Sequence, residues 1–138
     1  MTSRTDLQAF INACRYGVVA TNSASGPPQS AVVGLAATKA LELVFDTTAT
    51  TRKILNLRRD PNISVVVGWS DDGTVQYEGA ADEPTGEELA RIQGAYFEAF
   101  PDGPERLKWP GITYVRIRPT WIRFTSYTQP AKNMEVVF

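Results

Sequence analysis

The residues best suited to chemistry in this chain lie in the segment 45–61, FDTTATTRKILNLRRDP. An apolar stretch that ends at Phe45 is followed by Asp46, by a threonine-rich segment, and then by two adjacent cations, Arg52 and Lys53. Hydroxyl groups, free backbone N–H groups and cations at the start of a helix together suit the binding of a phosphate group. The helix dipole adds a partial positive charge at the same place. The segment therefore predicts a site for a phosphorylated small molecule.

The chain has no histidine, which excludes several classes of enzyme. Catalysis by Ser-His-Asp or Cys-His needs an imidazole base, and most zinc sites need histidine or several cysteines. The single cysteine, Cys14, lies among apolar residues, where a small core residue is expected. No metal site is expected, and no side chain stands out as a catalytic acid or base. If the protein is an enzyme, a bound cofactor has to supply the difficult chemistry.

Length and charge are typical of a soluble globular domain. The 138 residues correspond to a single domain over 1–138, of which 43% are hydrophobic, and the net charge is −1. A near-neutral chain lacks the broad positive surface that nucleic-acid binding requires. No apolar run approaches the roughly 20 residues of a membrane span. No signal-peptide pattern is present, so a cytoplasmic protein is expected.

The elements that position the threonine-rich segment follow from periodicity and turn composition. A threonine followed three residues later by Gln8 or Glu88 predicts a capping box at two helix starts, Thr5 and Thr85. Apolar residues at helical spacing predict three helices, over about 6–15, 52–60 and 85–100. Apolar or alternating stretches predict six strand regions, at 16–21, 29–36, 41–45, 63–69, 74–81 and 112–127, the last bent at Pro119.

Short links of hairpin type join most of these strands. Asp72-Gly73 is one of them, because glycine supplies the positive φ that a tight hairpin turn needs. Antiparallel strands in this number usually close into a small barrel, which removes exposed strand edges. A mainly β fold of the α+β type is therefore predicted, and the apolar residues 134–138 are expected to pack on a neighbour.

The order of these elements resembles that of the pyridoxamine 5'-phosphate oxidase-like proteins, a family of flavin-binding split β-barrels. The resemblance extends over roughly residues 7–126. Its most recognisable piece is a strand that ends in a threonine, then Thr51-Arg52-Lys53, then Leu57 and Pro61. It implies a six- to seven-stranded antiparallel split β-barrel with about three helices. Other matching motifs are Val18-Val19-Ala20-Thr21, Gly26-Pro27-Pro28-Gln29, Glu78-Gly79-Ala80-Ala81 and Pro119-Thr120-Trp121.

The resemblance implies that FMN lies in a groove between the two subunits of a homodimer. Arg52 and Lys53 would bind the FMN phosphate with a hydrogen bond from Thr51, whereas the alternative for both cations is a solvated helix face. Asp46 and Thr47 would line the flavin at the strand end, largely through their backbone.

Further residues are expected near the flavin ring. The strand Ser30–Val33, with Ala31 and Val32, would lie beside the ring. Gln76 would contact the flavin or, alternatively, face solvent. Trp109, in the loop 108–111, is expected either in the ligand wall or in the dimer contact.

The chain departs from the oxidase itself in three places. The second strand region has Ser30–Leu35 where the oxidase has a run that contains two cations. Thr74 replaces a flavin-contacting glutamine, although Gln76 lies two residues further on the same face of the strand. The segment 124–130 lacks the histidine-containing motif that helps the oxidase to hold its substrate. Oxidation of pyridoxamine phosphate is therefore not implied.

Three functions are compatible with these residues. The first is an FMN-dependent oxidoreductase that acts on a small planar or anionic molecule stacked on the flavin. The second is a carrier or sensor of the same fold that holds a flavin, a deazaflavin or haem without turnover, which the missing cations favour. The third is a protein that keeps the fold and dimerises without any cofactor.

Overall fold

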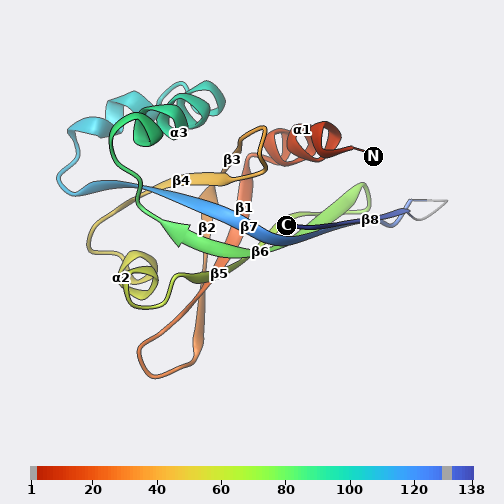
Figure 1. Cartoon of the computed structure of the whole chain (residues 1–138), viewed down its shortest axis with the longest axis horizontal. Coiled ribbons are helices and arrows are strands. Elements are labelled where there is room, and N and C mark those ends of the chain that lie inside the picture. Colours follow the sequence, from red (N-terminus) through yellow and green to blue (C-terminus); the bar gives the residue numbers. More distant parts are fainter. Residues whose placement is uncertain (1–2, 129–131) are drawn as a thin grey trace.

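The computed structural model describes residues 3–128 and 132–138. In this part of the chain the strands form one antiparallel sheet that curls into a half-open barrel (Figure 1). Seven strands follow the order β2-β1-β5-β6-β7-β4-β3, and β8 pairs with β7 off this path. The strands are β1 (Tyr16–Asn22), β2 (Pro28–Gly34), β3 (Ala36–Ala37), β4 (Leu43–Thr48), β5 (Asn62–Ser70), β6 (Gly73–Asp82), β7 (Ile112–Ser126) and β8 (Lys132–Val137).

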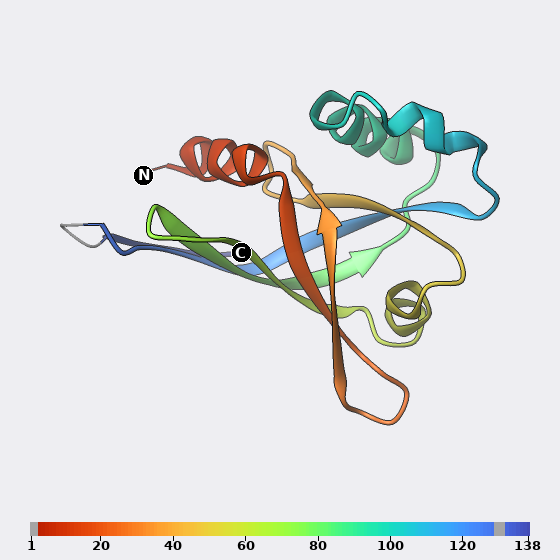
Figure 2. The same cartoon turned by 180° about the vertical axis from the view of Figure 1, so that it is seen from behind.

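The helices lie at two places around the sheet. The cartoon and its reverse view show α1 and α3 on the same side of the molecule, beside β3, and α2 at another edge (Figures 1 and 2). None of the helices in the described part of the chain has both the length and the hydropathy to cross a bilayer. The helices are α1 (Arg4–Cys14), α2 (Arg52–Arg59), α3 (Gly86–Ala99) and a 3-10 helix, η1 (Gly103–Lys108).

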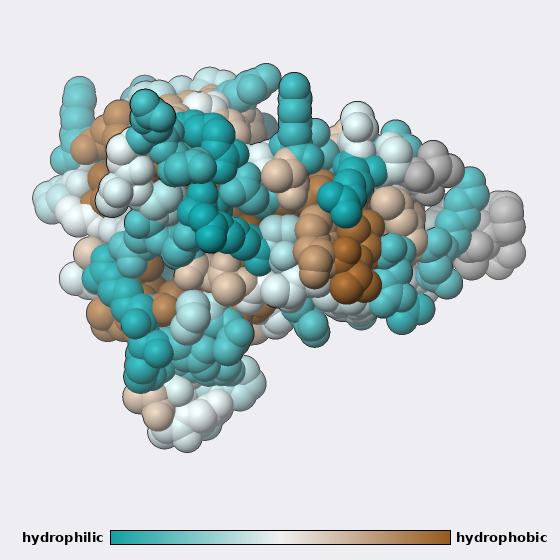
Figure 3. Space-filling view, viewed as in Figure 1, coloured by the Kyte–Doolittle hydropathy of each residue, from teal (hydrophilic) through white to brown (hydrophobic). Residues whose placement is uncertain are grey.

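The predicted fold class is confirmed, with one additional strand. The C-terminal residues form β8, which pairs with β7 from Trp121–Val137 to Ser126–Lys132. This pairing leaves Val137 and Phe138 exposed, close to the apolar patch that Figure 3 shows where the C-terminus is marked in Figure 1. Packing of these residues on a neighbour stays a prediction.

The local turn and capping predictions are confirmed only in part. Gly73 has a φ of 151° in the β5–β6 hairpin, as the Asp-Gly turn predicted. Helix α1 begins earlier than expected, because Ser3 rather than Thr5 caps it and accepts a hydrogen bond of 3.1 Å from the Asp6 N–H. Thr85 is the N-cap residue of α3, but its side chain makes no capping hydrogen bond.

Two apolar clusters hold the end of β4 in place. Phe45 belongs to the main core inside the barrel, whereas Val44 belongs to a second cluster beneath α3 with Tyr96 and Tyr114. Successive residues of a strand point to opposite faces, so Asp46 lies on the α3 side. Strand β4 is thereby fixed on both faces at the point where the threonine-rich segment begins.

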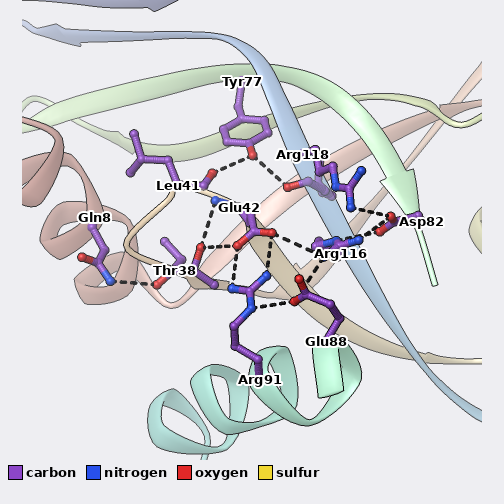
Figure 4. Close-up of polar contacts among 12 residues, drawn as sticks. Gln8, Thr38, Leu41, Glu42, Tyr77, Asp82, Glu88, Arg91, Arg116 and Arg118 are labelled. Atoms are coloured by element: carbon purple, nitrogen blue, oxygen red, sulfur yellow. Dashed lines mark hydrogen bonds and ion pairs between the residues drawn. The ribbon is translucent and has the colours of Figure 1, made fainter. Parts of the chain in front are cut away.

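Ion pairs attach α3 to the sheet (Figure 4). Arg91 of α3 donates to both carboxylate oxygens of Glu42, at 2.9 and 3.0 Å, and to Glu88 at 2.7 Å. The Arg116 side chain is 4% exposed and makes a bidentate pair with Asp82 at 2.9 and 2.6 Å. The buried guanidinium therefore has charged partners, as burial of a charge requires.

Candidate functional site

The turn between β4 and α2 is built by short-range hydrogen bonds. The hydroxyl oxygens of Thr47 and Thr51 share a hydrogen bond at 2.9 Å. The Thr51 N–H donates to the Thr48 carbonyl at 3.2 Å, and the Ala49 N–H donates to the Gly111 carbonyl at 2.8 Å. Thr51 is the N-cap residue of α2, so the first N–H groups of that helix have no intrahelical acceptor. The predicted strand–turn–helix arrangement is confirmed.

A groove of about 370 Å³ lies between this turn and the first two strands. We call it the phosphate groove, after the ligand that the sequence predicts. Thr51, Arg52, Lys53 and Ala31 all line it, so the structure brings four of the predicted site residues together. The other residues of its lining are Val19, Thr21, Gln29, Ser30 and Thr50.

Buried Asn56 joins α2 to both strands of the phosphate groove. Its amide nitrogen donates to the Thr21 hydroxyl at 3.0 Å and to the Gln29 side-chain oxygen at 2.9 Å. Asparagine is a poor helix former, so its place inside a short helix is the one sequence signal for this role. No sequence motif indicated a role for Asn56, and Gln29 appeared only as the last residue of the motif Gly26-Pro27-Pro28-Gln29.

Arg52 and Lys53 differ from the other cations of α2. Arg58 makes a bidentate pair with Glu83 at 2.8 and 2.9 Å, and Arg59 donates to a backbone carbonyl at 2.7 Å. Within the described residues, neither Arg52 nor Lys53 makes a hydrogen bond or an ion pair through its side chain, and no carboxylate lines the groove. The groove can therefore offer both charges to an anionic ligand.

Burial and a neighbouring charge act on the pKa of Lys53 in opposite directions. Burial lowers the pKa of Lys53, because a desolvated ammonium group is less stable, and the negative charge of Asp46 raises it. The Asp46 carboxylate itself accepts hydrogen bonds from Arg106 at 2.6 Å and from the Tyr96 hydroxyl at 3.1 Å. Its side chain thus points toward α3 and η1 and is not part of the groove lining.

The remaining predicted residues lie outside the groove of a single chain. Val32 is 66% exposed on the outer face of the sheet. Strand pairing places Val32, Val18, Val66 and Gln76 in one row across four strands of that face. Trp109 is exposed directly after η1. In one chain these residues therefore do not meet Arg52 and Lys53 in the same cavity.

The described residues offer little for metal binding. No group of three or more Cys, Asp and Glu side chains within 3–128 and 132–138 is arranged to hold a metal ion. The site has cations, hydroxyl groups and N–H donors, which suit an anion rather than a metal.

Several solved structures share this fold. A haem-binding protein from Mycobacterium smegmatis superposes with a TM-score of 0.80 at 20% identity over 97% of the chain, and the chain spans only 58% of that protein. The conserved hypothetical protein Rv2991 from Mycobacterium tuberculosis gives 0.76 at 26% identity, with 93% of this chain and 87% of that one covered. HutZ, the haem storage protein from Vibrio cholerae, gives 0.73 at 14% identity, with 86% and 91% covered.

The sequence itself identifies the family. No curated protein is significantly similar to the chain. The family model described as pyridoxamine 5'-phosphate oxidase matches residues 4–126, which include the turn, the phosphate groove and nearly the whole sheet. The chain therefore belongs to the pyridoxamine 5'-phosphate oxidase family.

Proposed function

We propose that the protein is a homodimeric flavoprotein that binds FMN and oxidises or reduces a small molecule. The observation that carries this proposal is the phosphate groove. Arg52 and Lys53 lie there beside Thr51, at the start of α2, and neither has a carboxylate partner within the described residues. Charge-assisted hydrogen bonds from such donors suit a terminal phosphate. The small side chain of Ala31, also in the lining, leaves room for a flat ring along β2.

The exposed outer face of the sheet supports the homodimer. Val32 is 66% exposed, Val66 40% and Tyr16 49%, and all three lie on neighbouring strands. An apolar surface of this kind is typical of a protein–protein contact. A second copy that covers this face would also cover Gln76 of the same row, and would place Val32 and Gln76 at the edge of a shared site.

In this proposal the flavin and the protein side chains have different roles. When bound, the flavin ring supplies the redox chemistry. Arg52, Lys53 and Thr51 hold the phosphate end, and Asn56 keeps α2 at a fixed distance from the strands that face the ring. No catalytic acid or base is assigned. The expected cytoplasmic location is part of the same proposal.

The proposal is tested by replacing both cations. Arg52→Ala/Lys53→Ala should weaken FMN binding by at least about tenfold, because each charge-assisted contact contributes roughly 1.5–3 kcal/mol and solvent reduces the share of exposed Arg52. Arg58→Ala is the matched control, since Arg58 lies on the same helix but pairs with Glu83 outside the groove. Fluorescence titration of flavin gives the dissociation constants. Equal affinity in the wild type and the double variant would reject the phosphate assignment.

A carrier that binds a cofactor without turnover is the second candidate. The structural similarity to haem-binding and haem storage proteins favours it. Haem without histidine would need a cysteine, methionine or tyrosine ligand, and burial raises the pKa of the Cys14 thiol, which opposes the thiolate form. No cysteine, methionine or tyrosine lines the phosphate groove, so this site favours a flavin or a phosphorylated deazaflavin over haem.

Spectroscopy separates the two candidates. A flavoprotein should absorb at about 450 nm. An oxidoreductase should lose this absorbance when NADH or NADPH is added and recover it in air. A carrier should keep its spectrum under the same conditions. Mass spectrometry of the small molecule that copurifies distinguishes FMN from a deazaflavin and from haem.

A further inference from the structure

A second cavity of about 740 Å³ lies between α1, α3 and the loop from β3 to β4. It is about twice the volume of the phosphate groove, and it shares no residue with it. Both cartoon views show α1 and α3 on the same side of the molecule beside β3 (Figures 1 and 2). This volume is in the range of sites for small organic ligands.

The apolar part of the lining consists of small side chains, which leave the space between the helices empty, and the other lining residues are polar or charged. Four alanines come from three different elements of the chain, and none can fill the volume between the helices. They are Ala37, Ala40, Ala95 and Ala99. Methyl groups on several sides present an apolar surface to a ligand without blocking it.

The cavity also contains charged groups that the fold leaves available. Arg15 uses one N–H for the Ala99 carbonyl, at 3.2 Å, and its guanidinium lies 4.7 Å from the centre of the Phe100 ring. Its other N–H donors have no hydrogen-bond acceptor among the described residues. Lys39 and Glu98, which also line the cavity, likewise make no hydrogen bond or ion pair within that part of the chain.

Arg91 belongs to the lining but adds little free charge. Its guanidinium donates to both oxygens of Glu42, at 2.9 and 3.0 Å, and to Glu88 at 2.7 Å (Figure 4). The charge balance of the cavity therefore depends on Arg15, Lys39 and Glu98, with one more cation than carboxylate. The phosphate groove, by contrast, has two cations and no carboxylate in its lining.

The wall of the cavity is held in a defined conformation. The Asn12 side chain bonds both backbone groups of Ala37, accepting at 2.8 Å and donating at 3.2 Å, and Gln8 donates to the same carbonyl at 3.2 Å. Arg15 (φ 67°) and Leu41 (φ 63°), which follows Ala40, are the two non-glycine residues with positive φ in the described chain. Such strained residues concentrate at functional sites.

We propose that this cavity binds a small organic monoanion with a flat apolar body, of the aromatic carboxylate class. The carboxylate would accept hydrogen bonds from Arg15 and Lys39, and the apolar body would lie against the alanines. The excess of a single positive charge favours a monoanion over a phosphate dianion. This site is separate from the phosphate groove and does not depend on flavin binding.

The test uses 2-naphthoate as the probe and 2-naphthylmethanol as its neutral counterpart. Calorimetry on the 138-residue protein should show that naphthoate binds at least about tenfold more tightly than the alcohol, because only the anion forms charge-assisted hydrogen bonds. Lys39→Gln should weaken naphthoate binding roughly three- to tenfold, since its contact is partly exposed to solvent. Lys132→Gln, an exposed lysine on β8 outside the cavity, should leave it unchanged.

A second variant tests the position of the site. Ala95→Leu places a larger, helix-favouring side chain in the cavity and should abolish naphthoate binding while FMN affinity stays as in the wild type. Circular dichroism checks that the fold is kept. The proposal is overturned if the two probes bind equally, if Ala95→Leu binds naphthoate normally, or if naphthoate shows no binding. A wild-type protein that binds naphthoate but not FMN would count only against the phosphate groove.

Discussion

Asp46 interacts with two cations, Arg106 and Lys53, but forms an ion pair only with Arg106. Arg106 of η1 donates to its carboxylate at 2.6 Å, and both side chains are largely buried, at 18% and 14% exposed. Lys53 lies on the groove side and experiences the Asp46 charge without forming an ion pair with it. Arg106 therefore balances a negative charge that would otherwise act on the proposed phosphate ligand.

Arg106 should therefore affect the binding of FMN. Arg106→Gln should weaken FMN binding roughly three- to tenfold, because an uncompensated carboxylate at several ångströms opposes the phosphate. Adding Asp46→Asn in the same chain should restore the affinity, since the negative charge is then gone. Titration of FMN into the single and double variants measures the effect. A double variant that binds as poorly as the single one would show that Arg106 acts through packing instead.

The residues of the phosphate groove were partly predictable from the sequence. Arg52 and Lys53 are neighbours in a local strand–turn–helix pattern, which needs no knowledge of the fold. Asn56 and Arg106 act on partners 27 to 60 positions away, so only the folded chain shows their roles. The same holds for Arg116, whose partner Asp82 is 34 positions away.

At the level of elements, Glu42 links α3 to the sheet through Arg91, in addition to the apolar cluster beneath the helix. The hydrogen bonds from Arg91 lower the pKa of Glu42 below its ordinary value of 4.5, with Thr38 and the charge of Arg116 acting in the same direction and burial opposing them. A carboxylate with a lowered pKa in the folded state stabilises the fold at neutral pH. That stabilisation is lost as the pH falls through 4.5 toward the pKa in the folded protein.

The stability of the fold should therefore depend on pH through Glu42. Glu42→Gln should lower the free energy of unfolding at pH 7 by about 1–3 kcal/mol, because it removes the charge-assisted hydrogen bonds with Arg91, although Arg91 keeps Glu88 and Arg116 keeps Asp82. Below pH 4.5 the difference between the variant and the wild type should shrink, since the wild-type carboxylate is then becoming protonated. Urea denaturation at several pH values measures both. Glu87→Gln, which changes an exposed acid of α3, should show neither effect.

Element boundaries were less predictable than element types. Strand alternation and the Asp72-Gly73 turn are local patterns, and the structure confirms them. The start of α1 was placed too late, because the capping box at Thr5 matches the sequence rule as well as the actual cap at Ser3. The sequence predicted apolar packing for residues 134–138 but not the strand β8, which pairs with the directly preceding strand β7.

For the whole molecule, the exposed row on the outer face of the sheet predicts how two copies meet. Val32→Glu should shift the hydrodynamic mass from dimer to monomer, because a buried unpaired charge costs several kcal/mol in an apolar contact. Lys132→Glu, a charge reversal on exposed β8 away from that row, should leave the mass unchanged. Light scattering after size-exclusion chromatography measures both. A Val32→Glu protein that stays dimeric would place the contact on another face.

Val32 and Gln76 share one row of the sheet, whereas Arg52 and Lys53 line a separate groove of the same chain. If two chains complete the site, association and cofactor loading are thermodynamically linked. Dimer association would then favour cofactor binding, and cofactor binding would favour association. Diluting the loaded protein should release the nucleotide, and adding the nucleotide should lower the concentration at which the chains pair. Abundance in the cell would in that way regulate how much of the protein is loaded.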